Sequence, residues 1–97
     1  MEVVYKDAIQ IELKSDRIDY EREKEYAVEY NGTILPHKFY ADFVAFDKII
    51  LEVKSAYGGF CDDDIAQVIN YLKVSGCKIG LLINFGKNRL EYKRIVL

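Results

Sequence analysis

Residues 41–54 read ADFVAFDKIILEVK, an apolar stretch that predicts two strands joined by a tight turn. Three polar residues interrupt it, namely Asp42, Glu52 and Lys54. Charged groups are costly to bury unless they are paired or bind a metal. Two carboxylates and an amine in such a stretch therefore require either a structural or a chemical explanation.

Successive side chains of a strand point to opposite faces. In the first strand, one face is expected to carry Tyr40, Asp42, Val44 and Phe46, and the other Phe39, Ala41, Phe43 and Ala45. In the second strand, Ile50, Glu52 and Lys54 are expected to lie opposite Ile49, Leu51 and Val53. Both faces are largely apolar, so we expect both to be covered by other parts of the chain.

The two carboxylates lie on neighbouring strands and can converge on one point. Oxygen ligands of this kind suit Mg²⁺ or Mn²⁺. Lys54 is expected on the same side as Glu52, where its ammonium could orient or help deprotonate an attacking water, or offset charge on a phosphate. The alternative is a structural salt bridge from Lys54 to Asp42 or Glu52 that only holds the sheet together.

The rest of the chain predicts a single α/β domain over residues 1–97. A helix is expected over residues 1–15, and Asn31-Gly32 is expected to join strands at about 19–30 and 34–46. The later elements are a strand over 49–54, a loop over 55–60, a helix from Asp62 ended by Gly76, and strands over 78–85 and 89–97. This order predicts a mixed sheet with helices packed on it.

Both expected helices have an apolar stripe with polar residues beside it. In the first helix, the stripe comprises Tyr5, Ala8, Ile9, Glu12 and Leu13, with Glu2 on the same side. In the second helix, the core stripe comprises Ile65, Val68, Ile69 and Leu72. Gln67 and Tyr71 share an offset face of that helix, which could look along the sheet toward Lys54.

Several classes of protein are disfavoured by composition. A net charge of −2 argues against coating nucleic acid by bulk electrostatics, although Lys87, Arg89, Lys93 and Arg94 could form a local basic surface. No apolar run is long enough to span a bilayer, and the first residues do not resemble a secretory signal. The two cysteines lack metal-ligand spacing, so we expect a cytoplasmic protein with reduced thiols.

Other candidate motifs have simpler explanations. His37 is the only histidine and has no paired cysteines, so a surface role is expected instead of a zinc site. Residues 62–64 are three consecutive aspartates, which do not face one point on a helix. Their expected role is to stabilise the positive end of the helix that they begin.

In combination, Asp42, the segment Glu52-Val53-Lys54 and the segment Gln67-Val68-Ile69-Asn70-Tyr71 resemble the PD-(D/E)XK nuclease pattern with a RecB-like Q-x-x-x-Y helix. More closely, the chain resembles small nuclease-like proteins named for a GxxExxY signature, here Glu2-x-x-Tyr5. The glycine of that signature would precede Met1, and Ala41 stands where the superfamily name has proline. The resemblance extends over nearly the whole chain and implies a restriction-endonuclease-like αβββαβ core.

The resemblance also implies roles for individual residues. Asp42 and Glu52 would bind Mg²⁺ or Mn²⁺, and the Val53 carbonyl would complete the protein ligands. Lys54 would serve the attacking water. The further catalytic residues would be Glu2, an accessory acid, together with Gln67 and Tyr71, which would order the site.

Three functions remain open at this point. The first is a metal-dependent nuclease that hydrolyses DNA or RNA. The second is a nuclease-fold module with little or no catalysis that binds nucleic acid or a protein partner. The third is a structural protein whose buried charges neutralise one another. A homodimer is plausible for each, because a small two-sided sheet with two helices can leave apolar surface exposed.

Overall fold

A computed structural model describes residues 1–55, 58–86 and 90–97. The elements are α1 (Glu2–Ser15), β1 (Tyr20–Tyr30), β2 (Thr33–Ala45), β3 (Ile49–Lys54), α2 (Asp62–Ser75), β4 (Ile79–Asn84) and β5 (Glu91–Val96). Their order and their approximate bounds confirm the sequence prediction. Lys87 and Arg89, half of the expected basic surface, lie outside the described residues, as does part of the loop over 55–60.

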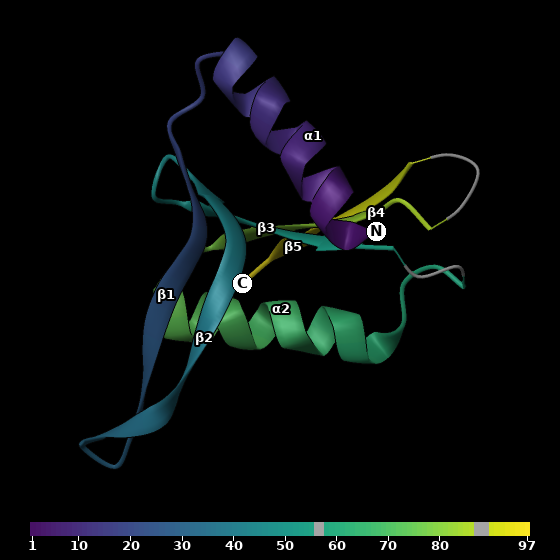
Figure 1. Ribbon diagram of the computed structural model, residues 1–97. Coiled ribbons are helices and arrows are strands. Elements are labelled where there is room, and N and C mark those ends of the chain that lie inside the picture. Colours follow the sequence, from purple (N-terminus) through teal and green to yellow (C-terminus); the bar gives the residue numbers. More distant parts are fainter. Residues whose placement is uncertain (56–57, 87–89) are drawn as a thin grey trace.

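The five strands form one mixed sheet in the order β1-β2-β3-β4-β5. Only β3 and β4 pair in parallel, and α2 makes the crossover between them. Figure 1 shows α1 on one side of the sheet and α2 on the other. The predicted class, a mixed sheet flanked by helices, is therefore confirmed. Neither described helix is long and apolar enough to cross a membrane.

The β1–β2 hairpin turns at Asn31 and Gly32, whose φ angles of 50° and 78° are those of the expected turn. The β2–β3 turn differs from its prediction. Phe46, expected in the strand, lies in the turn with φ of 55°, and Asp47 follows with φ of 57°. The left-handed conformation of Phe46 is stabilised by the hydrogen bond that its backbone N–H donates to the Asp19 carbonyl at 2.8 Å.

Two apolar clusters cover the two faces of the sheet. Val68 and Leu72 of α2 pack over one face together with Ile50, whereas Leu13 of α1 packs over the other with Leu51. The predicted stripe of α2 is confirmed. The predicted assignment of faces in β3 is also confirmed, because Ile49, Leu51 and Val53 all join the α1 side.

The simple alternation expected across residues 39–46 is wrong. Ala41 belongs to the cluster beneath α2, whereas Phe43 belongs to the cluster beneath α1. Alternate residues of β2 therefore belong to different clusters on the two sides of Asp42. The β1–β2 register is unbroken here, but the β2–β3 ladder ends at the Phe43–Leu51 pair, so the hairpin beyond that pair can twist away from the rest of the sheet.

The expected stripe of α1 is only partly correct. Leu13 is buried and Tyr5 and Ile9 are half-buried, but Ala8 and Glu12 are exposed. The helix meets the sheet along residues 5, 9 and 13, and turns its other flank toward β1. That flank brings Lys6 and Gln10 into half-buried positions.

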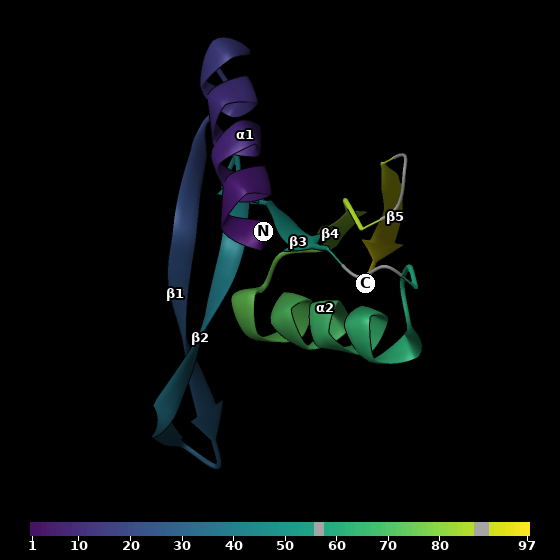
Figure 2. The same cartoon turned by 45° about the vertical axis from the view of Figure 1, so that its right-hand side comes forward.

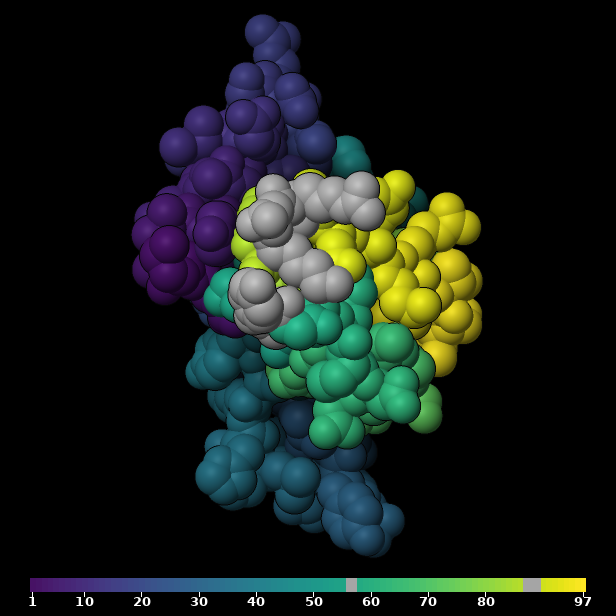
Figure 3. All heavy atoms as spheres, turned by 90° about the vertical axis from the view of Figure 1, so that its right-hand side faces the viewer, coloured from purple at the N-terminus to yellow at the C-terminus, as the bar shows by residue number. Residues whose placement is uncertain are grey.

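The β1–β2 hairpin extends past α2 as an arm. Figure 2 shows the same arm from a second direction, and in Figure 3 its tip protrudes from the packed body. The longest principal extent of the molecule, 44 Å against 31 and 24 Å, agrees with this projection. Tyr30 and Ile34 near the tip are about two-thirds exposed, at 66% and 65%.

Gly80 provides a test of the packing between α2 and the sheet. A Cβ atom at this position would lie 2.6 Å from Cγ1 of Val68, which is fully buried and stiff at χ1. We expect Gly80→Ala to destabilise the fold by about 1–3 kcal/mol through overpacking. Gly58→Ala is the matched control because no atom lies within 4 Å of its added Cβ. Urea unfolding measures both variants, and equal stability of Gly80→Ala and wild type would contradict this packing.

Candidate active site

The candidate site lies where β2 and β3 separate. Beyond the Phe43–Leu51 pair, the two carboxylates replace the backbone ladder. The Val53 N–H donates to Asp42 Oδ2 at 2.7 Å, and the Asp42 N–H donates to Glu52 Oε1 at 3.2 Å. The two strands are thus joined reciprocally through side chains. Each carboxylate stabilises the backbone beside the other, and the sequence prediction that they converge is confirmed.

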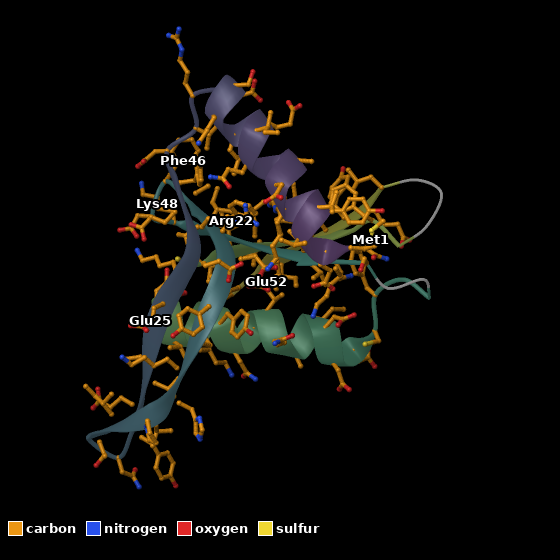
Figure 4. The ribbon with its side chains drawn as sticks, in the orientation of Figure 1. Met1, Arg22, Glu25, Phe46, Lys48 and Glu52 are labelled. Carbon is orange, nitrogen blue, oxygen red and sulfur yellow. The ribbon has the colours of Figure 1, made fainter. Side chains whose placement is uncertain are left out.

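Both carboxylates are almost inaccessible to solvent, with Asp42 8% and Glu52 6% exposed. Burial, followed by the negative charge of Asp42, raises the pKa of Glu52 to about 8. Figure 4 shows Glu52 between α1 and α2, on the inner side of the molecule. The surroundings therefore disfavour a negative charge on Glu52, and a cation bound beside the two carboxylates would stabilise that charge.

Lys6 of α1 contacts the candidate site, and the sequence reasoning missed this contact. Its ammonium lies 2.8 Å from Asp42 Oδ1 and 2.9 Å from Glu23 Oε1. Burial lowers the pKa of Lys6, but hydrogen bonds to Asp42 and Glu23 outweigh this effect and raise it to about 12. The only sequence signal was a lysine beside the Tyr5–Leu13 stripe, and that position is common for lysines that lie in solvent.

Lys54 contacts α2 as expected, but it does not form the structural salt bridge to Asp42 or Glu52 that the sequence left open. Its Nζ donates to Gln67 Oε1 at 3.4 Å and lies 3.8 Å from Asp64 Oδ1. No ion pair with Asp42 or Glu52 forms among the described residues, so that alternative is wrong. Asp64 also accepts the Cys61 N–H at 3.1 Å, which fits the expected role of the acidic run at the start of α2.

The Gln67–Tyr71 pair continues the network from Lys54. Gln67 Nε2 donates to the Tyr71 hydroxyl oxygen at 2.7 Å. Burial, and then the charge of Glu52, raise the pKa of Tyr71. The Tyr71 ring stacks on Phe39 with a centroid distance of 4.1 Å. Because Phe39 lies on the β1–β2 arm, this contact holds the arm, α2 and the lysine network together.

Glu2 lies exposed in the first turn of α1. Its carboxylate makes no hydrogen bond or ion pair within residues 1–55, 58–86 and 90–97. The start of α1 is nonetheless fixed against the body of the protein, because Tyr5 stacks on Phe85 with a centroid distance of 4.5 Å and nearly parallel rings. The accessory role of Glu2 stays a prediction.

The donor set fits a divalent cation. Asp42 and Glu52 present hard oxygen atoms from adjacent strands, and Asp42 Oδ1 already accepts a cation in the form of the Lys6 ammonium. In the part of the chain that the structure describes, no cluster of three or more Asp, Glu, His or Cys side chains is available. Mg²⁺ in proteins is typically bound by one or two carboxylates and several waters, so a pair of carboxylates suits such an ion.

The comparisons with known proteins confirm the restriction-endonuclease-like fold expected from the sequence. A sequence model of the PD-(D/E)XK nuclease superfamily matches residues 1–95, and the chain therefore belongs to that superfamily. The crystal structure of SSO0001 has a similar fold, with a TM-score of 0.77 and 20% sequence identity, over 96% of this chain and 48% of that chain. This chain thus spans about half the length of SSO0001. No curated protein matches the chain in sequence.

Membership in the superfamily indicates the general chemistry. Proteins of this superfamily are of the nuclease type, act on nucleic acids and generally depend on divalent metal ions.

The raised pKa of Glu52 predicts a pH dependence of stability in chelator. Because the carboxyl holds its proton in the folded state up to about pH 8, stability should fall as pH rises from its unfolded value of 4.5 toward 8. One such proton contributes a slope of at most about 1.4 kcal/mol per pH unit. Glu52→Gln removes this contribution, so its stability advantage over wild type should grow with pH across this window. Urea unfolding at several pH values measures the difference, which parallel curves would contradict.

Proposed function

We propose that this protein is a metal-dependent nuclease that hydrolyses phosphodiester bonds of DNA or RNA with water as the nucleophile. The observation that supports it most directly is the buried Asp42–Glu52 pair beside Lys54, at the point where β2 and β3 separate. A buried pair of like charges with a raised pKa is the kind of arrangement found at functional sites. Superfamily membership supports the same chemistry.

In this proposal, Asp42, Glu52 and the Val53 carbonyl hold Mg²⁺ or Mn²⁺. The bound ion would supply Lewis-acid activation of water and neutralise charge on the phosphate. Glu52 must lose its proton to act as a ligand, and a nearby dication favours that loss. The 2.7 Å hydrogen bond from the Val53 N–H fixes the orientation of the Asp42 carboxylate before the ion arrives.

Lys54 contributes the positive charge on the protein side of the reaction. Its Nζ would hold the attacking water or stabilise the negative charge that develops on phosphate oxygens. Gln67 accepts one of its hydrogens at 3.4 Å and is itself held by Tyr71 at 2.7 Å. These two residues therefore position the ammonium, and Glu2 is the accessory acid that α1 would bring to a bound substrate.

Replacing Asp42 or Lys54 tests the proposal. Asp42→Asn should abolish both metal binding and cleavage. Lys54→Met should keep metal binding and lower the cleavage rate by about 100-fold or more, because charge stabilisation in the transition state is lost. Isothermal titration with Mg²⁺ and Mn²⁺, together with cleavage of labelled single- and double-stranded DNA and RNA, measures both properties.

The controls are Asp19→Asn and Lys48→Met, which remove the same charges from exposed positions. Both should bind metal and cleave as wild type does. Circular dichroism establishes that each variant is folded. Wild-type cleavage rates in both Asp42→Asn and Lys54→Met would contradict the proposed site.

The second candidate is a nuclease-fold module that binds nucleic acid or protein without effective catalysis. The observation that favours it is the pairing of Asp42, since one oxygen accepts the Val53 N–H and the other contacts the Lys6 ammonium. This function predicts a measurable affinity for nucleic acid in a filter-binding or anisotropy assay, with no turnover in Mg²⁺ or Mn²⁺.

We further propose the finer assignments that the resemblance suggests. The chain would be a GxxExxY-type member of the superfamily that acts in the cytoplasm as a homodimer. Exposed apolar side chains support association, among them Ile11 of α1 at 66% and Tyr92 of β5 at 71% exposure. Sedimentation equilibrium measures the oligomeric state.

A further inference from the structure

Lys6 contacts the candidate site from α1 and has no place in the proposed chemistry. Its side chain is only 16% exposed, and its two partners differ in accessibility. The Asp42 side chain is 12% exposed, whereas the Glu23 side chain is 48% exposed. Lys6 is therefore an ammonium shared between a buried carboxylate that belongs to the site and a carboxylate at the surface.

The contact with Asp42 uses the oxygen that a metal ion would need. Asp42 Oδ2 accepts the Val53 N–H at 2.7 Å, which leaves Oδ1 as the outward atom, and Lys6 Nζ lies 2.8 Å from it. An ammonium and a divalent cation on the same carboxylate oxygen would lie a few ångströms apart and repel each other strongly in this partly dry region. The two cations therefore compete for one oxygen.

The structure also shows where the ammonium can go. Glu23 Oε1 lies 2.9 Å from Lys6 Nζ, on the neighbouring strand β1 and at a more exposed position than Asp42. The φ of 55° at Glu23 sets this residue apart from the regular strand around it. Lys6 can thus leave Asp42 and keep one carboxylate partner, so its release does not require an unpaired charge.

We propose that Lys6 is a built-in counter-ion of Asp42 that competes with the metal ion, and that Glu23 receives the lysine when the metal binds. The inference rests on the proposed function, because it concerns the same metal site. It makes Lys6 a positioning residue that sets the metal affinity and keeps the buried carboxylates neutralised in the metal-free protein.

Two substitutions with opposite expected effects test the proposal. Lys6→Met removes the competing ammonium and keeps the length of the side chain. It should tighten Mn²⁺ binding by about tenfold, a change of about 1.4 kcal/mol. Glu23→Gln keeps the ammonium but removes its second partner, so it should weaken Mn²⁺ binding. Isothermal titration of Mn²⁺ into the chelator-treated protein measures both dissociation constants without any cleavage assay.

Matched controls separate this competition from a change in net charge. Lys14→Met removes a lysine from the exposed last turn of the same helix, and Glu21→Gln removes an exposed carboxylate from the same strand as Glu23. Surface charges at a distance are screened by salt, so each control should change the dissociation constant by less than about twofold.

Thermal unfolding gives a second readout. In chelator, Lys6→Met should melt below wild type because Asp42 is left buried and unpaired, and saturating Mn²⁺ should raise its melting temperature by more than it raises that of wild type. Glu23→Gln retains the Lys6–Asp42 pair and provides an independent test of the proposal if Lys6→Met does not fold in chelator.

The outcomes distinguish the inference from the proposed function. Tighter binding in Lys6→Met with weaker binding in Glu23→Gln supports competition. Weaker or unchanged binding in Lys6→Met, with wild type still binding Mn²⁺, overturns the inference alone and leaves the proposed function standing. Absence of Mn²⁺ binding in wild type and all variants overturns the proposed function and the inference with it.

Discussion

The fold depends on burying two carboxylates at the point where β2 and β3 stop pairing. An unpaired backbone N–H inside a protein costs about as much as a lost hydrogen bond, and a buried carboxylate costs more. Asp42 and Glu52 solve both problems together, because each carboxylate accepts a hydrogen bond from a backbone N–H of the opposite strand. Among the described residues, no buried side-chain nitrogen or oxygen is left without a hydrogen-bond partner. Where the backbone ladder ends, two hydrogen bonds from backbone N–H groups to carboxylates take its place.

This opening also explains the arrangement of the surrounding elements. Because β2 pairs with β3 only from Phe43 onward, the preceding part of the β1–β2 hairpin turns away from the sheet and packs its Phe39 ring against Tyr71 of α2. On the other side, α1 packs across the opened end and is fastened by the Tyr5–Phe85 stack. The carboxylate pair at this separation is thus flanked by both helices. Lys54 approaches it from the α2 side and Lys6 from the α1 side.

The electrostatics of the site follow from an imbalance between its two lysines and its carboxylates. Lys6 is shared between Asp42 and Glu23, and Lys54 contacts Gln67 and Asp64, so neither lysine forms an ion pair with Glu52. Burial then keeps the Glu52 pKa near 8. A site that is stable with a proton or an ammonium in place of a metal ion can fold before the metal arrives. This property separates it from zinc domains, which are unfolded without their metal.

The sequence alone determined the order of elements, their approximate bounds, the faces of β3, the convergence of Asp42 and Glu52, and the contact of Lys54 with α2. These features follow from local periodicity and from the alternation within one short strand. The contact of Lys6, the exposure of Glu12 and the division of β2 between the two apolar clusters depended on tertiary structure. Which flank of α1 meets β1, and where β2 separates from β3, are decided by packing between segments that are far apart in the chain. No local pattern in the residues themselves records those contacts.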